Sequence, residues 1–375
     1  MIFRNFRLIF PDRIENGSLQ IRDGKIISVN GPFIEDDEVI DGEGKYLSPG
    51  FIDIHIHGAG GKDTMDGEVE SINTIAGVIA EHGTTSFLPT TMTMGVPEIR
   101  KALASIMEAA KNPIGASILG VHLEGPFISP KAIGAQNPGF VLEPSIEAYE
   151  SITDGYEDLV TSITMAPEVP GASELIPYLK QKGVRVSIGH TAATYDEAIV
   201  GIGLGCSHST HLFNAMTPLT HRSPGTVGAI FDTDITTETI SDGIHISWPS
   251  LRIAYRQKTS DKVMLVTDAM MACGMPDGKY WLGGQEVLTK DGAARLLNGS
   301  LAGSILTMDA AVRNVARNTS LPLYEVVKMA SLNGARFCGA DDRKGKIAEG
   351  YDADLLVFDE DVNISHVFIE GRKFK

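Results

Sequence analysis

The sequence has few cysteines and no long apolar run. Cys206, Cys273 and Cys338 are an odd number without a C-x-x-C pair, which argues against a disulfide framework and favours a reducing compartment. No run of about 18 apolar residues exists, so we expect no membrane-spanning helix. The amino terminus mixes arginines with apolar residues and lacks the pattern of a signal peptide. We therefore expect a cytoplasmic protein that does not bind membranes.

Positive charge is also scarce. Lys and Arg total 32 against 48 Asp and Glu, so the formal net charge is −16, which disfavours nucleic acid as a partner. An anionic small substrate would need a local basic pocket. The 375 residues, 43% of them hydrophobic, can bury one large core, which suits a barrel of about 250–300 residues with a smaller appendage.

Both ends of the chain carry strand signals. Apolar residues flank Asp23-Gly24 near the start and Glu370-Gly371 near the end. Glycine favours hairpin turns at such positions because it accepts the positive φ that these turns need. We predict that residues 1–49 and 345–375 pair into one small β-sandwich domain.

Between the two ends, helix and strand patterns alternate. Apolar residues recur on one helical face over residues 69–79, and a β-branched strand follows at 84–88. Pro97 suits the first turn of the next helix, whose buried stripe we expect to include Met107. Such alternation is typical of parallel βα units. We predict that residues 50–344 form a (β/α)8 barrel.

Further local signals mark single elements of this region. Residues 118–121 are expected to form one strand and residues 322–333 one helix. Thr194 and Glu197 fit a capping box at a helix start, and Gly83 fits a left-handed helix end.

Five short polar clusters follow apolar runs in this central region. Because the carboxyl ends of barrel strands meet at one face, we expect these distant clusters to share a site there. Their imidazoles and carboxylates are typical of a metal-assisted hydrolase. The clusters are Asp53-Ile54-His55-Ile56-His57, His122-Leu123-Glu124-Gly125-Pro126, Gly189-His190-Thr191, Thr210-His211-Leu212-Phe213-Asn214 and Thr267-Asp268-Ala269.

Glu124, His190 and His211 are the candidate ligands of a main metal ion. One carboxylate and two neutral imidazoles leave an open coordination position for water, as a catalytic zinc or ferrous ion requires. Each residue alone would more often be a surface or core residue, and the coincidence of the three favours the metal site. Zinc, iron, manganese and cobalt all suit these ligands. His122 lies on the same side of its strand as Glu124, either beside the ligands or as a core histidine.

A second group of residues is expected at the same face. His55 and His57 are alternate residues of one strand and can hold one ion together. Asp268 is the candidate general base, which takes a proton from the attacking water and returns it to the leaving group; its alternative role is a helix cap. His245 is expected to polarise a substrate carbonyl, or else to lie at the rim. We assign no role to His82, His208 and His366.

One loop combines amide and cationic groups. Asn214 and Ala215 precede His221 and Arg222 by a few residues. A planar guanidinium suits bidentate binding of phosphate, so this loop is a candidate basic pocket for an anionic substrate. A surface arginine is the alternative reading.

These clusters resemble the N-acetylglucosamine-6-phosphate deacetylases of the amidohydrolase superfamily over nearly the whole chain. The strings at 120–127 and 210–216 are specific to the deacetylases, whereas those at 49–58 and 350–355 are general to the superfamily. Gly189-His190-Thr191 and the string at 301–304 also match. The resemblance implies hydrolysis of N-acetylglucosamine 6-phosphate to glucosamine 6-phosphate and acetate, in amino-sugar catabolism.

The resemblance also implies roles for single residues. Glu124, His190 and His211 would hold one divalent ion, zinc or iron, and Asp268 would be the acid/base. A second ion, held by His55, His57 and Asp268 and bridged by Glu124, is an open alternative. The substrate contacts that it implies are His245 and the backbone near Ala135 for the sugar, Asn214, Ala215 and Arg222 for the phosphate, and Leu301, Ala302 and Gly303 for the pocket wall.

Members of this family are similar in forming homodimers, so His221 and Arg222 are candidates to act across a subunit interface. Glu124 replaces the lysine that other binuclear relatives carbamylate, which argues against a dihydroorotase-like enzyme. Two alternatives stay open at this stage. One is an amidohydrolase acting on another N-acyl amino sugar or a cyclic amide. The other is a non-catalytic relative, which we would expect to have lost a ligand.

Overall fold

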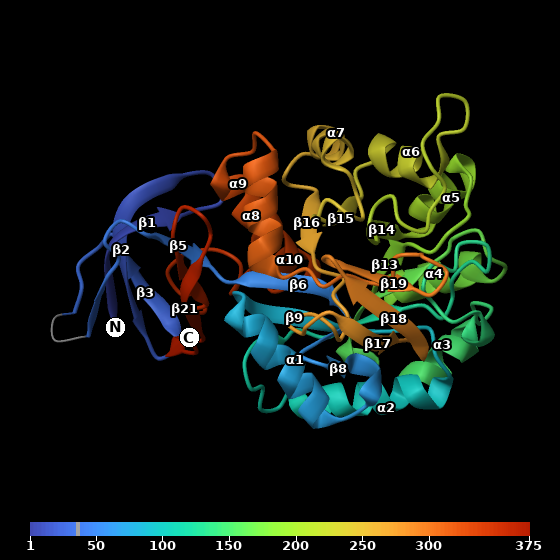
Figure 1. Cartoon of the computed structure of the whole chain (residues 1–375), viewed down its shortest axis with the longest axis horizontal. Helices are drawn as coiled ribbons and strands as arrows, with labels where there is room; N and C mark the ends of the chain where they lie inside the picture. Colours follow the sequence, from blue (N-terminus) through green and yellow to red (C-terminus); the bar gives the residue numbers. More distant parts are fainter. Residues whose placement is uncertain (35–37) are drawn as a thin grey trace.

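The computed structural model describes residues 1–34 and 38–375. A barrel of parallel strands lies beside a smaller sheet, to which both ends of the chain contribute (Figure 1). Residues 35–37, which belong to the first predicted β segment, lie outside the described residues. The fold class that the sequence predicts, a (β/α)8 barrel with a small β domain, is confirmed.

The barrel consists of parallel strands that follow one another around the ring. A short strand, β10 (Ser117–Ile118), extends one edge by pairing with β9. The ring closes between its first and last strands, where the Asp268 N–H donates to the His55 carbonyl oxygen at 2.9 Å. The strands are β6 (Phe51–Ile56), β9 (Thr84–Thr91), β11 (Val121–Glu124), β12 (Val160–Met165), β13 (Arg185–Ile188), β14 (Cys206–Ser209), β15 (Thr236–Ile240) and β16 (Val263–Val266).

Helices cover the outside of the barrel (Figure 1). They are α1 (Val69–Glu81), α2 (Val96–Ala109), α3 (Ile146–Thr153), α4 (Ala172–Gln181), α5 (Tyr195–Leu204), α6 (Gly225–Asp232), α7 (Trp248–Lys258), α8 (Met308–Asn318), α9 (Leu323–Ala330) and α10 (Leu332–Cys338). Short 3-10 turns occur at Thr64–Asp66, Pro138–Phe140 and Glu157–Leu159. Because parallel strands need a crossover between neighbours, helices end up on the outer face of the sheet.

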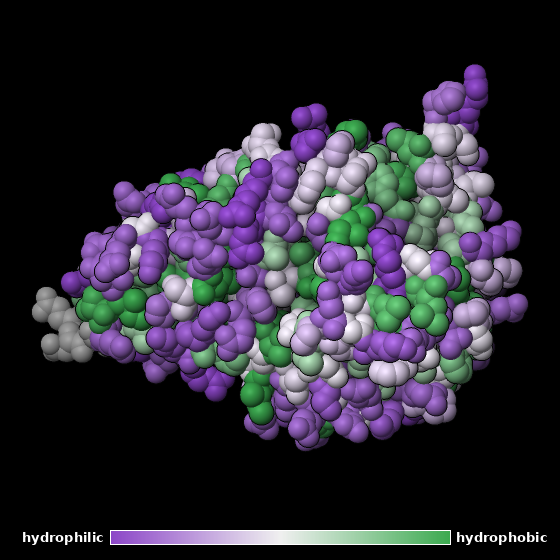
Figure 2. Space-filling model, viewed as in Figure 1, coloured by the Kyte–Doolittle hydropathy of each residue, from purple (hydrophilic) through white to green (hydrophobic). Residues whose placement is uncertain are grey.

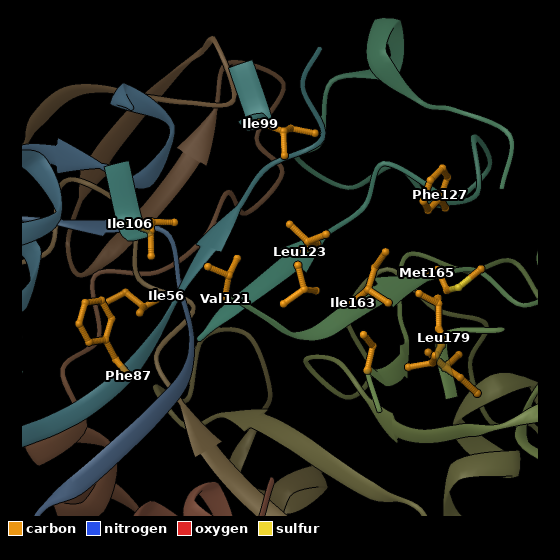
Figure 3. Packing of buried hydrophobic residues seen from close by; sticks show 14 of the residues in the cluster. Ile56, Phe87, Ile99, Ile106, Val121, Leu123, Phe127, Ile163, Met165 and Leu179 are labelled. Atoms are coloured by element: carbon orange, nitrogen blue, oxygen red, sulfur yellow. The ribbon is translucent and has the colours of Figure 1, made fainter. Parts of the chain in front are cut away.

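The core lies between the outer side of the strands and these helices. Phe87, Val121 and Leu123 of β9 and β11 pack near Ile99 and Ile106 of α2 (Figure 3). Each is at most 1% exposed, and burying such a side chain contributes about 1.5–3 kcal/mol. This apolar shell holds the strand ends in place, and the strand ends in turn place the polar clusters.

Local signals predict several element ends correctly. Helix α5 begins with the predicted capping box, since the Glu197 N–H donates to Thr194 Oγ1 and the Thr194 N–H donates to Glu197 Oε2. Helix α1 ends where expected, before Gly83 with φ of 85°. Met107 of α2 was predicted wrongly, because its side chain is 40% exposed. Met107 follows the buried Ile106 by one residue, and a helix turns about 100° per residue.

Two predicted elements are interrupted. The strand expected to run through residues 118–121 stops after Ile118, and β11 begins only at Val121. Gly120 lies between the two pieces with φ of 136°. The single helix expected over residues 322–333 is two helices, α9 and α10, separated at Ser331.

The terminal sheet joins strands from both ends of the chain. Residues Tyr46–Pro49 pair antiparallel with Leu355–Phe358. Phe3 and Phe368 lie on strands with two others between them, yet their ring centroids are 5.0 Å apart. Strands in a flat sheet are about 4.8 Å apart, so this sheet must curl around its own core. Its strands are β1 (Ile2–Ile9), β2 (Ile14–Arg22), β3 (Lys25–Val29), β4 (Val39–Asp41), β5 (Tyr46–Pro49), β20 (Leu355–Phe358), β21 (Ile364–Ile369) and β22 (Arg372–Lys373).

Two small sheets lie near the ends of the barrel strands. One is the pair β7 (Gly58–Ala59) and β8 (Lys62–Asp63). The other has three antiparallel strands, β17 (Gly278–Leu282), β18 (Gln285–Lys290) and β19 (Ala293–Leu296). The sequence suggested no element for residues 278–296, and this insertion supplies one wall of the site described below.

The surface is largely polar. Hydrophilic side chains cover most of the visible face, and the hydrophobic ones form separate groups over the terminal sheet and the barrel (Figure 2). Among the described helices, none is both long and apolar enough to span a bilayer.

Candidate metal centre and active site

A cavity of about 430 Å³ opens at the carboxyl end of the barrel strands. It brings together most of the residues that the sequence predicted. The predicted residues that line it are His57, Glu124, Ala135, His190, His211, Asn214, Ala215, His245, Asp268, Leu301 and Gly303. His55 lies directly behind them and is fully buried.

The first cluster consists of Glu124, His190 and His211. Glu124 is the last residue of β11, and the two histidines follow β13 and β14. Glu124 Oε1 lies 3.1 Å from His211 Nε2 and 3.3 Å from His190 Nε2, and the two Nε2 atoms are 3.1 Å apart. Three ligand atoms from three strands therefore point at one small volume.

The second cluster consists of His55, His57 and Asp268. The Nε2 atoms of the two histidines lie 3.3 Å apart, and both lie within 3.5 Å of Asp268 Oδ1. Glu124 belongs to both clusters, because its Oε2 lies 3.2 Å from His57 Nε2. The geometry matches two adjacent cation sites that share one carboxylate.

The backbone is unusual where these strands end. His190, His211 and Asp268 have positive φ angles of 46°, 29° and 47°. Residues with a side chain rarely adopt this conformation, and it tends to persist where function requires it. Each of the three residues directs its side chain into the cavity at this bend.

Backbone carbonyls orient two of the imidazoles. His57 Nδ1 lies 3.2 Å from the Thr90 carbonyl oxygen, and His190 Nδ1 lies 3.1 Å from the Ala132 carbonyl oxygen. A carbonyl only accepts, so each ring carries a proton on Nδ1 and turns Nε2 toward the cluster. His211 Nδ1 has no hydrogen-bond partner in the described part of the chain.

The two clusters carry strongly interacting charges. Burial would raise the pKa of Glu124, but His55 and His190 outweigh burial and hold that pKa well below its ordinary value. Burial would lower the pKa of His57, but Asp268 and Glu124 raise it well above its ordinary value. The carboxylates thus favour positive charge at the centre.

The donor set fits a divalent cation. In both clusters each of the three side chains offers one nitrogen or oxygen ligand atom. The three atoms of a cluster lie within 4.8 Å of one another. Carboxylate oxygens and imidazole nitrogens that converge in a buried space favour positive charge there, which a bound cation would supply. Imidazole and carboxylate ligands suit zinc and iron.

Asp268 and His245 both line the cavity. Burial would raise the pKa of Asp268, but His55 and His57 outweigh burial and lower it, which keeps the carboxyl ionised. His245 Nδ1 lies 2.7 Å from Asp242 Oδ2, so the opposite ring nitrogen is free to face the cavity that His245 lines.

Three residues predicted to bind substrate do not line the cavity. Ala302 is fully buried beneath it, because the neighbouring residues Leu301 and Gly303 face the opening instead. His221 and Arg222 are exposed and lie outside the cavity of a single chain. Among the described residues that line the cavity, Arg295 of β19 is the only lysine or arginine.

His122 and Asp53 stand behind the cavity. The ring centroid of His122 lies 4.7 Å from that of His55, and burial lowers the pKa of His122 to about 3. His122 is therefore a neutral core histidine beside the ligands. Asp53 accepts from Thr267 Oγ1 at 2.5 Å and from the His55 N–H at 3.2 Å, which ties β6 to the end of β16.

The sequence reasoning missed several polar residues that contact the clusters. Gln136 lines the cavity and donates from Nε2 to Glu124 Oε2 at 2.5 Å. Glu238 of β15 lies 2.9 Å from His55 Nδ1. His208, to which no role was assigned, lies 3.2 Å from the same carboxylate. One signal was available for Glu238, because an acidic residue inside the β-branched run Thr236–Ile240 needs a buried partner.

Known proteins resemble this chain over almost its whole length. The sequence profile of the amidohydrolase family matches residues 46–373. The N-acetylglucosamine-6-phosphate deacetylase of Lysinibacillus sphaericus is 40% identical, over 99% of this chain and 97% of that protein. The N-acetylgalactosamine-6-phosphate deacetylase of Escherichia coli O157:H7 is 35% identical, over 96% and 95%. The crystal structure of the N-acetylglucosamine-6-phosphate deacetylase of Pasteurella multocida is 32% identical, with a TM-score of 0.95 over 99% of this chain and 98% of that one.

Proposed function

This chain belongs to the amidohydrolase family, and we propose that it hydrolyses N-acetylglucosamine 6-phosphate to glucosamine 6-phosphate and acetate. The observation that carries the proposal is the convergence of Glu124, His190 and His211 within a cavity that Asp268 also lines. Relatives of 35–40% identity act on N-acetylated hexosamine phosphates, as their names state. We place the reaction in cytoplasmic amino-sugar catabolism.

Glu124, His190 and His211 would hold the catalytic cation, zinc or iron. When bound, such an ion lowers the pKa of a coordinated water to about 7 and polarises the acetyl carbonyl. Gln136 supports this set by donating to the second oxygen of Glu124.

Asp268 is the proposed acid/base. Its ionised carboxylate takes a proton from the attacking water, and it then passes that proton to the nitrogen of the sugar so that the amine can leave. His245, held by Asp242, donates to the oxygen of the acetyl group as negative charge develops there.

The clusters have room for two ions. His55, His57 and Asp268 would hold the second, with Glu124 shared between the two sites. Asp268 would then have two roles, as a ligand of the second ion and as the proton carrier.

The phosphate needs positive charge, which is scarce in this acidic chain. Arg295 supplies it from the cavity wall, and Asn214 and Ala215 line the same cavity. We propose that the chain forms a homodimer, in which the exposed His221 and Arg222 loop of each copy reaches the phosphate end of the other cavity. Sedimentation of the wild-type protein tests the dimer.

Acetate release from the metal-loaded enzyme tests the function. We expect turnover of N-acetylglucosamine 6-phosphate and much weaker turnover of N-acetylglucosamine. The galacto epimer, N-acetylgalactosamine 6-phosphate, is the second candidate substrate, because one relative is named for it. No acetate from either phosphorylated sugar would refute the proposal.

A further inference from the structure

A buried carboxylate lies behind the second cluster. Glu238 is the middle residue of β15 and is 1% exposed. Placing an ionised carboxylate in a protein interior is costly unless donors satisfy its oxygens. No lysine or arginine forms an ion pair with Glu238 among the described residues, so its partners must be other polar groups.

Three N–H groups meet this carboxylate. His55 Nδ1 lies 2.9 Å from Oε2, and the backbone N–H of His211 donates to the same oxygen at 3.0 Å. His208 Nε2 lies 3.2 Å from Oε1. His208 is itself held by Thr236, whose Oγ1 lies 2.7 Å from Nδ1. The three partners and Thr236 all lie in or next to β6, β14 and β15.

These contacts decide which way the ring of His55 faces. An ionised carboxylate only accepts, so the proton of His55 sits on Nδ1. Nε2 is then directed toward the second cluster, where it lies 3.3 Å from His57 Nε2 and 3.5 Å from Asp268 Oδ1. His57 and His190 rely on backbone carbonyls for the same purpose, whereas His55 relies on a charged side chain.

We propose that Glu238 is the positioning residue that enables His55, His57 and Asp268 to hold a second cation. This inference rests on the proposed function, because it assumes that the two clusters bind metal. Partners that orient a ligating histidine typically change metal affinity by about 10–100-fold. The first cation depends less on Glu238, because Glu238 contacts only the backbone of His211.

Glu238→Gln is the direct test. Glutamine keeps the shape but presents an NH2 group to donors, so it cannot accept from His55, His208 and the His211 backbone together. We expect the metal-stripped variant, titrated with Co²⁺, to bind the first ion within a few-fold of wild type. The second ion should bind about 10–100-fold more weakly.

Thr237→Val is the matched control. Thr237 neighbours Glu238 on the same strand and is also buried; its hydroxyl lies 2.6 Å from Ser209 Oγ and donates weakly to the Glu238 carbonyl oxygen at 3.5 Å, without contacting the Glu238 carboxylate. This variant should bind two Co²⁺ ions per chain as wild type does. Equal affinity of wild type and Glu238→Gln for the second ion would overturn the proposal, and so would a wild type that binds only one ion.

A measurement on the unaltered protein covers the case in which Glu238→Gln does not fold. Cobalt shifts the NMR signals of protons close to it, including the Nδ1 protons of coordinated imidazoles. We expect the second equivalent of Co²⁺ to add two exchangeable N–H signals, from His55 and His57. Loss of the His55 signal would contradict the proposed tautomer. Both experiments run without substrate, so failure of the deacetylase reaction would not be confused with failure of this inference.

Discussion

Two groups of buried charges in this molecule are satisfied in opposite ways. Lys344 is almost fully buried and lies 2.6 Å from Asp354 and 3.1 Å from Asp352. At the active centre, Glu124, Asp268 and the histidines turn several like ligand atoms toward the same small volume. The first group pairs opposite charges within the chain. The second group gathers several ligand atoms of the kind that could hold a cation.

Their positions explain the difference. Lys344 lies between α10 and the terminal sheet, and Asp354 also accepts the backbone N–H of Glu370 at 2.8 Å. Lys25 and Arg343 pair with Asp352 at 2.6 and 2.7 Å. This group joins the barrel to the terminal sheet. Buried charges that neutralise one another indicate a structural role, whereas several imidazoles that converge on shared carboxylates indicate a binding site.

Asp268→Asn should produce the largest effect, and we expect it to change turnover without changing stability. An amide cannot take the proton of the attacking water, so we expect kcat to fall by about 10²–10⁴-fold. The midpoint of thermal unfolding of the metal-loaded protein should change little. Kinetics of acetate release check the first point and circular dichroism the second. Turnover near that of wild type would exclude Asp268 as the proton carrier.

Lys344→Met should show the reverse pattern. It leaves the buried carboxylate of Asp354 without its cation, which typically costs about 3–5 kcal/mol of unfolding free energy. Urea unfolding measures this loss, and kcat/KM of the folded fraction should match wild type. Adding Asp354→Leu should restore part of the stability. A change below about 1 kcal/mol in the single variant would mean that this ion pair does not join the two parts.

Arg295→Ala tests whether the cavity wall supplies the positive charge that binds the substrate phosphate. Arg295 lines the cavity without an ion-pair partner among the described residues, so its charge is available to phosphate. We expect KM for N-acetylglucosamine 6-phosphate to rise about tenfold, because a hydrogen bond to a charged group contributes about 1.5–3 kcal/mol. Steady-state kinetics check this.

Lys279→Ala is the control for that variant. Lys279 belongs to the same three-stranded sheet but pairs with Glu286 and is largely exposed. Its removal should leave KM unchanged. An equal KM for the two variants would exclude Arg295 from phosphate binding.

Asp309→Asn should produce the smallest effect, because the contacts of Asp309 with His82 and Arg313 are only partly buried. Burial would raise the pKa of Asp309, but hydrogen bonds with His82 and Thr307 outweigh burial and lower it. A lowered native pKa stabilises the fold above the unfolded pKa of about 3.9, and this stability is lost as pH falls through the native pKa. We expect a deficit of about 1 kcal/mol at pH 7 that narrows below about pH 4. Melting curves from pH 7 to pH 3 test this, and a deficit that widens with acid would contradict it.

Much of the architecture follows from short stretches of sequence. The turn at Asp23-Gly24 and the capping box of Thr194 and Glu197 involve neighbours in the chain, so their geometry is decided locally. The cluster residues could be recognised because polar residues directly after apolar strands have few structural uses. The exposed Met107 and the break at Ser331 show where periodicity alone gives the wrong answer.

The contacts between strands could not be read in this way. The register of β14, β15 and β6 around the barrel decides which imidazole Glu238 orients. It also decides that His208 shares the carboxylate of Glu238. The place of Arg295 depends on how an inserted sheet folds over the opening. Such pairings join residues far apart in the chain, and the pattern of one strand does not state the alignment of its neighbours.

The sequence by itself determined the five polar clusters, because each stands at a strand end that local pattern marks. The tertiary structure alone decided how those residues divide into two clusters and which groups orient the imidazole rings. It also decided that the side chain of Arg295 reaches the cavity. The physical reason is that metal binding and proton transfer depend on ångström distances between side chains. Those distances are set by packing of the whole barrel.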